Sequence, residues 1–167
     1  MKVYTFTTLF CILSWVNAFG QIQLPAGKHE VNGNIFNVGY TDITVVVWND
    51  KNIYPIPAPI GQFPPMAIRR GDMRVDTLQQ QKIIKEIVKS RFKVLKEGNQ
   101  WIRIKYIFNQ SGEVMNVIFS FPHGALLTLT DVAEMDRRLR QELKATFRGV
   151  EYRSYQAIPY GYQYWFK

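Results

Sequence analysis

The spacing of the hydrophobic residues changes three times between Asp76 and Phe166, and this order limits the folds open to the chain. Apolar side chains first recur at the spacing of one helix face, then at every second position of two strands. Helical spacing then returns, and a last strand alternates again. We therefore predict a helix, a hairpin, a second helix and a terminal strand. This order defines an α+β fold whose helices pack on one face of an antiparallel sheet.

Two helices are predicted, over Asp76–Glu97 and Thr130–Phe147. The first opens with an acid followed three residues later by Gln79, which resembles a capping box. The second is capped by Thr128 or Thr130. The apolar face of the first helix comprises Ile84, Ile87, Val88, Phe92 and Leu95. The stripe of the second comprises Val132, Met135, Leu139, Leu143 and Phe147.

The hairpin between the helices is apolar on both faces. One face of its first strand carries Ile102, Ile104, Tyr106 and Phe108. The turn is expected at Asn109–Gly112, because Asn and Gly tolerate positive φ. The same face of the second strand carries Met115, Val117, Phe119 and Phe121, and these sets are expected to lie beneath the helices. The opposite face carries Trp101, Ile107, Val114 and Ile118, so we expect the N-terminal segment or another subunit to cover it.

Residues 1–20 have the pattern of a secretory signal peptide. Lys2 precedes an uncharged run from Val3 to Val16, and Ala18-Phe19-Gly20 provides a cleavage site. The apolar run is shorter than the roughly 20 residues that a membrane-spanning helix requires, so no transmembrane segment is expected in the mature chain. We expect the mature protein to begin at Gln21 and to be secreted.

The mature chain would contain no cysteine, because Cys11 is removed with the signal peptide. A secreted domain without disulfides favours a bacterial periplasmic or cell-surface location. Removal of Lys2 leaves a net charge of +7, which suits an anionic partner such as a glycan or another envelope polymer. Nucleic acid is not expected as a partner, because the chain is exported and has no recognisable binding module.

The N-terminal third, residues 21–71, is predicted to combine β-structure with a proline-rich stretch. The β-branched run Ile43–Trp48 indicates a strand. Five prolines then favour an extended conformation: Pro55, Pro57, Pro59, Pro64 and Pro65. We therefore divide the mature chain into this segment and an α+β domain over residues 72–167.

The hairpin and the terminal strand resemble the C-terminal domain of TonB. The likeness lies in the strand from Trp101 to Asn109, the turn at Gly112, the strand around Val117 and a last strand after Pro159. It covers about residues 72–167 and implies the helix-hairpin-helix-strand layer expected above. The chain also resembles the short secreted proteins of unknown function that are common in gut Bacteroides, which implies a compartment but no activity.

Lysines recur along one side of the first predicted helix: Lys82, Lys85, Lys89, Lys93 and Lys96. At 1.5 Å rise per residue they would form a cationic row about 20 Å long, able to follow an anionic polymer. The alternative is a solvated helix face, with Glu86 placed to pair with Lys82 and Lys89. We favour the solvated face, because charge on the outward side of a helix is the default.

The terminal strand is the better candidate for binding. Tyr160, Tyr162, Tyr164 and Phe166 alternate with Gly161, Gln163 and Trp165. Aromatic side chains here, with Trp165 on the other face, could contact a partner, and an open strand edge could accept an added strand. Alternatively, the tyrosine face is core beneath the second helix.

No motif for catalysis is present, and we predict neither catalytic residues, nor a cofactor, nor a metal site. His29 and His123 lack ligands at metal-binding spacing. The sequence therefore favours a non-enzymatic binding module of the bacterial envelope, with an envelope protein or an anionic or glycan polymer as partner; a homodimer is compatible with it. The alternatives are a small envelope hydrolase or enzyme inhibitor, or a carbohydrate-binding protein, which would need coplanar exposed aromatic rings.

Overall fold

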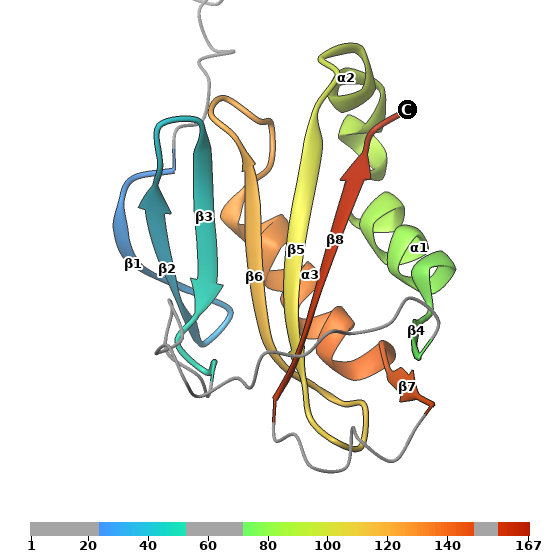
Figure 1. Cartoon of the computed structure of the whole chain (residues 1–167). Helices are drawn as coiled ribbons and strands as arrows, with labels where there is room; N and C mark the ends of the chain where they lie inside the picture. Colours follow the sequence, from blue (N-terminus) through green and yellow to red (C-terminus); the bar gives the residue numbers. More distant parts are fainter. Residues whose placement is uncertain (1–23, 53–71, 149–156) are drawn as a thin grey trace, which may run out of the picture.

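The computed structural model describes residues 24–52, 72–148 and 157–167. The expected signal peptide, its cleavage site and the proline-rich stretch lie outside these residues. A six-stranded antiparallel sheet has the order β1-β2-β3-β6-β5-β8 (Figure 1). Its strands are β1 Gly27–Val31, β2 Asn34–Tyr40, β3 Thr44–Asn49, β5 Trp101–Phe108, β6 Val114–Pro122 and β8 Ile158–Trp165. The helices are α1 Thr77–Ile87, α2 Phe92–Glu97 and α3 Leu129–Glu142, with a 3₁₀ turn at Lys89–Arg91.

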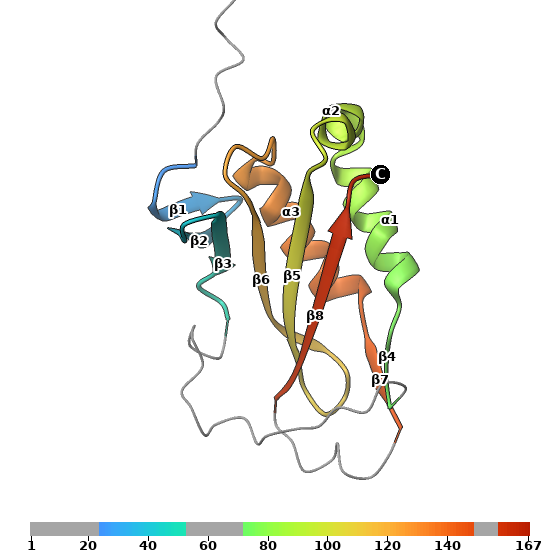
Figure 2. The same cartoon turned by 45° about the horizontal axis from the view of Figure 1, so that its top comes forward.

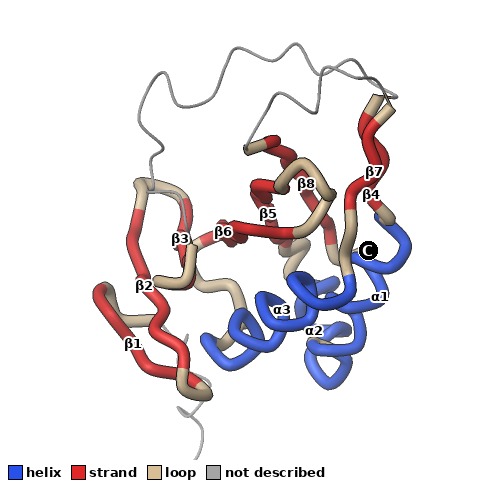
Figure 3. Tube along the Cα trace, turned by 90° about the horizontal axis from the view of Figure 1, so that it is seen from below, coloured by secondary structure: helices blue, strands red, loops and turns tan. Residues whose placement is uncertain are grey.

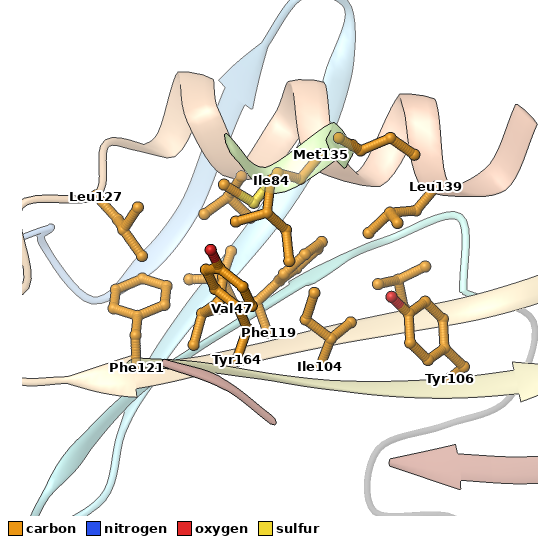
Figure 4. Packing of buried hydrophobic residues seen from close by; sticks show 14 of the residues in the cluster. Val47, Ile84, Ile104, Tyr106, Phe119, Phe121, Leu127, Met135, Leu139 and Tyr164 are labelled. Atoms are coloured by element: carbon orange, nitrogen blue, oxygen red, sulfur yellow. The ribbon is translucent and has the colours of Figure 1, made fainter. Parts of the chain in front are cut away.

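The helices lie on one face of the sheet, as Figure 3 shows from below. The predicted α+β class is therefore confirmed. Between the two layers, Ile84 of α1 and Met135 and Leu139 of α3 point toward Ile104 and Phe119 of the sheet (Figure 4). All five side chains are fully buried, so this layer is the core that holds the helices on the sheet.

The strands of the N-terminal segment belong to the same sheet as the later strands. β3 pairs with β6, and Trp48 lies opposite Ile118 in this ladder. The sheet thus crosses the expected boundary at residue 71. Residues 24–52 thus extend the sheet beyond β6, and the rest of the N-terminal segment, which we expected as one possible cover for the second face of the hairpin, lies outside the described residues.

The first predicted helix, Asp76–Glu97, is not continuous. α1 ends at Ile87, and a 3₁₀ turn separates it from α2, with Arg91 N donating to Val88 O at 2.8 Å. The turn changes the direction of the chain but keeps Val88 and Leu95 fully buried. It also brings Arg91 to an ion pair with Asp131 at the start of α3. The apolar residues of this segment are thus buried although the helix is interrupted.

The second predicted helix, Thr130–Phe147, is wrong at its C-terminal end. Thr128, rather than Thr130, caps α3, and it forms a capping box with Asp131. The helix ends at Glu142, and β7, Ala145–Phe147, pairs instead with β4, Met73–Val75. A backbone bond from Ala145 N to Gly112 O, 2.8 Å long, also holds β7 against the hairpin turn.

A β-bulge changes the face of one predicted core residue. Phe108 lies opposite Val114, whereas Ile107 lies opposite Asn116, so Met115 is the extra residue on β6. Met115 is therefore only half-buried, and Val114, expected on the other face, is buried. From Val117 onward the strand follows the predicted alternation, with Phe119 and Phe121 in the core.

Candidate functional site

β8 forms one border of the six-stranded sheet (Figure 2). Phe166 N donates to Gln100 O at 3.1 Å, and hydrogen-bonded pairs alternate along an antiparallel ladder. The backbone groups of Gly161, Gln163 and Trp165 therefore point away from β5. Within the residues that the structure describes, no strand pairs with this side of β8. The edge thus offers peptide groups to a further strand.

Pro159 lies near the start of this edge. It is opposite Ile107 of β5 and is exposed. Proline cannot donate a backbone hydrogen bond and is confined largely to edge strands, because a central strand needs that donor. The open edge therefore begins at Gly161, and Pro159 limits pairing beyond it.

The face of the sheet opposite the helices is called the outer face here. In β5 and β8 it carries Trp101, Arg103, Lys105, Gly161, Gln163 and Trp165, which alternate with buried or half-buried residues. Trp165 is 39% exposed, and its ring centroid lies 6.3 Å from that of Trp101. Arg103 lies over the Trp101 ring at 5.6 Å and donates to Gln163 Oε1 at 2.8 and 3.2 Å.

Tyr160 and Tyr162, which we proposed as binding residues, lie on the opposite side from Trp165. Both pack against the core beneath the helices and are half-buried. Gln81 of α1 donates to the Tyr162 hydroxyl at 2.9 Å, which ties β8 to α1. The packing of Tyr160 and Tyr162 therefore fits the alternative that the tyrosine face belongs to the core. The candidate surface therefore consists of the β8 edge and the outer face, and not of the tyrosine row.

A buried hydroxyl lies beside these tyrosines. Tyr106 is 1% exposed, and its hydroxyl has no hydrogen-bond partner among the described residues. Burial raises the pKa of Tyr106 well above its ordinary value, and the nearby Tyr160 and Tyr162 add to the shift. Gln80 of α1 is also fully buried, and neither atom of its amide group has a partner in the described part.

The proposed cationic row is not straight. Lys82 and Lys85 lie on α1, Lys89 lies in the 3₁₀ turn, and Lys93 lies on α2; all are exposed. The break after Val88 divides the row, so it does not present the linear strip that a continuous helix would give.

Lys85 lies one helical turn after Gln81 and therefore on the side of α1 next to β8. The structure thus brings one predicted lysine, Lys85, close to the β8 edge. The expected pairing of Glu86 with Lys82 and Lys89 is wrong, because Glu86 binds Arg138 of α3 at 2.8 Å. The lysines of α1 therefore keep their charge toward solvent.

A buried polar network was not predicted. Asn49 donates to Asp136 Oδ2 at 2.9 Å, and Arg140 Nε donates to both oxygens of Asp136 at 3.0 and 3.1 Å. Arg140 also donates to the carbonyl of Met115 and to Asn52. The only sequence signal was the i, i+4 spacing of Asp136 and Arg140. The groups satisfy one another, so the network joins β3, β6 and α3.

The two histidines have separate surroundings in the structure. His29 Nε2 lies 2.7 Å from Pro25 O, and the His123 ring packs edge-to-face on Tyr40 at 5.6 Å. His123 borders a small hollow lined by Leu24, Tyr40 and Leu127. Among the described residues no three His, Cys, Asp or Glu side chains are placed to hold a metal ion.

The fold and this surface define an α+β protein with a helix-covered sheet, an open strand edge at β8 and a basic, tryptophan-bearing outer face beside it. No protein-family model and no curated protein matches the chain. Among solved structures, it is similar to a DUF5043 family protein from Bacteroides uniformis ATCC 8492, with a TM-score of 0.65 and 18% identity. The match covers 84% of this chain and 85% of that chain. Identity this low shows a shared fold alone, and it does not confirm the likeness to TonB.

In the described ranges, no helix combines the length and the apolar character that crossing a membrane requires.

Proposed function

We propose that the protein is an exported, non-enzymatic interaction module of the bacterial envelope. It binds a protein partner that adds a strand to β8 and contacts the neighbouring outer face. Peptide groups of the two chains would provide affinity, and side chains at alternate positions would provide specificity.

One observation carries this proposal: the residues whose backbone points outward from β8 also carry their side chains on the outer face. Gly161, Gln163 and Trp165 meet both conditions. A partner strand would therefore contact the indole of Trp165 as it pairs with the edge. A partly exposed tryptophan beside unsatisfied peptide groups is typical of a binding surface, because its ring combines a large apolar area with one polar donor.

Stacking on a sugar chain is less well supported by the same surface. The Trp101 and Trp165 rings are inclined by 53°, so they do not form the coplanar platform that we required for carbohydrate binding. The guanidinium group of Arg103 also lies over the Trp101 ring, where it would compete with a stacked sugar. The geometry therefore favours a protein partner.

Crosslinking in cells tests the function. A photoreactive amino acid replaces Trp165 at the proposed surface or Arg137 on the exposed side of α3, where Arg137 pairs with Glu134 and Gln141 of its own helix. We expect protein adducts in the envelope fraction from position 165 and none from position 137. Adducts of the same proteins from both positions would contradict the proposal.

A second variant separates backbone pairing from side-chain contact. Gln163→Pro removes an outward N–H, whereas Gln163→Ala removes the amide group and keeps the N–H. Adduct formation from position 165 should be lost in the first background and retained in the second. Loss in both backgrounds, or in neither, would show that strand addition is not the mode of binding.

A further inference from the structure

Three neighbouring strands contain no acidic residue at all: β5, β6 and β8 have no Asp or Glu over their whole lengths. Their cations are Arg103 and Lys105, both on the outer face and both exposed. Arg103 already binds Gln163 and the Trp101 ring. Lys105 forms no hydrogen bond or ion pair with any residue that the structure describes. One positive charge on this face is thus available to a partner.

Gly161 leaves this charge accessible from beyond the edge. Gly161 lies directly opposite Lys105 in the β5–β8 ladder. A Cβ atom at Gly161 would meet no heavy atom within 4 Å, and the backbone there is not left-handed. The glycine is therefore not required by a turn or by close packing. Its structural effect is a gap in the row of side chains, between Lys105 and the open side of β8.

The dimensions suit a contact across this gap. Strands lie about 4.8 Å apart, so an added strand would lie about 10 Å from β5. A glutamate on the added strand and Lys105 together reach across that distance, because only the glycine lies between them. On the helix side of the same edge, the exposed Lys85 of α1 adds a positive charge.

We propose, on the basis of the function proposed above, that the partner is an extended protein segment with an acidic residue opposite Gly161. The carboxylate of that residue pairs with Lys105, and this contact sets the register of the added strand. Pairing of β8 with the β8 strand of a second copy does not fit, because β8 carries no acid to offer to Lys105. A glycan does not fit either, because it has no peptide groups to continue the ladder.

Peptide titrations followed by NMR test the inference on the isotopically labelled chain from residue 21 to 167. The probe is acetyl-Thr-Val-Thr-Glu-Thr-Val-Thr-amide, and its matched control has glutamine in place of glutamate. Both should shift the amide signals of Gly161 and Gln163. We expect the glutamate peptide to bind about two- to fivefold more tightly at low salt, as for an exposed ion pair, and the advantage to disappear at 1 M salt.

Variants test whether the tighter binding of the glutamate peptide depends on Gly161 and on Lys105. Lys105→Gln and Gly161→Val should each remove the preference for glutamate while both peptides still bind. Lys28→Gln is the control, because Lys28 lies at the opposite edge of the sheet and pairs there with Asp50. This variant should keep the preference. Gln163→Pro should prevent binding of both peptides.

The outcomes separate the inference from the function on which it rests. If the two peptides bind the unmodified chain with equal affinity and Gln163→Pro blocks both, an acidic residue does not set the register of the added strand. Strand addition itself would still stand. An equal loss of preference in Lys28→Gln and Lys105→Gln also overturns that role of the acidic residue, since charge alone would then suffice. Failure of both peptides to bind, or binding that Gln163→Pro leaves unchanged, overturns strand addition itself.

Discussion

Asn49 at the end of β3 donates a hydrogen bond to Asp136 of α3, 2.9 Å away, although 87 residues separate them in sequence. Both side chains are nearly inaccessible to solvent. Arg140 holds the other side of the same carboxylate. This contact ties the N-terminal strands to the helix layer, and it makes the carboxylate of Asp136 a sensitive point of the fold.

Replacement of Asp136 should therefore be costly. Asp136→Ala leaves Arg140 and Asn49 without their acceptor, and loss of one member of a buried ion pair costs about 3 kcal/mol. We expect the free energy of unfolding, measured by urea denaturation, to fall by that amount. Glu134→Ala is the control, because Glu134 pairs with Arg137 on the exposed side of α3, and it should cost less than about 1 kcal/mol. Equal losses in the two variants would contradict the role of the network.

Tyr106 should limit stability at alkaline pH. Its pKa is raised above the ordinary value of 10.0 by burial, so the hydroxyl loses its proton more readily in the unfolded chain than in the folded one. The free energy of unfolding is therefore unaffected by this group below pH 10 and falls as the pH rises above it. Burial also raises the pKa of Tyr160 and Tyr164, so they contribute in the same direction.

Tyr106→Phe tests this directly. The variant removes a buried hydroxyl that has no partner among the described residues, so we expect a gain of about 1 kcal/mol at pH 7. Thermal melts between pH 7 and 11 should also show a smaller alkaline decline than in the unmodified chain, with a residual decline from Tyr160 and Tyr164. A loss of stability at pH 7 would reveal a hydrogen bond that the hydroxyl makes in solution.

Two adjacent aromatic residues should respond in opposite ways. Tyr164 is 7% exposed and its ring packs edge-to-face on Phe166, so Tyr164→Ala should cost about 3 kcal/mol. Trp165→Ala should leave the melting temperature nearly unchanged and weaken partner binding, because the side chain lies on the outer face. Thermal melts, run beside the crosslinking assay with the photoreactive group moved to position 163, compare the two. Unfolding of Trp165→Ala would identify the residue as core.

Gly112 should tolerate no side chain. Its φ is +79°, and a Cβ atom there would lie 1.8 Å from the carbonyl oxygen of Ala145. Gly112→Ala must displace β7 from the turn as well as strain the backbone, so we expect a loss of more than about 2 kcal/mol. Gly161→Ala is the matched control with open space around it, and it should change the free energy of unfolding little. Similar urea midpoints for the two variants would refute the close approach.

Local alternation was the most reliable guide to the fold. In β5 and β8, the side chains that face the core occupy every second position, so a few consecutive residues are enough to predict them. The 3₁₀ turn after Val88 could not be found in this way. Val88 and Leu95 are buried in the structure, and their spacing of seven residues also fits an unbroken helix.

Contacts between distant segments were beyond such patterns. The β-branched run before Trp48 indicated a strand, but nothing local showed that β3 would pair with β6. The buried network depends on that pairing, so Asn49 gave no signal as a partner of Asp136. For the candidate surface, alternation placed Trp165 opposite the tyrosines, whereas the availability of Lys105 depends on Gly161, which lies in another strand.

The position of β8 at the border of the sheet has a consequence for how the molecule folds. On one side β5 pairs with β6, its neighbour in sequence. On the other side it pairs with β8, which comes much later in the chain, so that Ile102 lies opposite Tyr164. Such distant pairing slows folding, because a long loop must close first. During biosynthesis, β5 would form an unpaired strand edge without acidic residues until residues 158–165 have been synthesised. Chains cut short before Ile158 should therefore aggregate rather than fold.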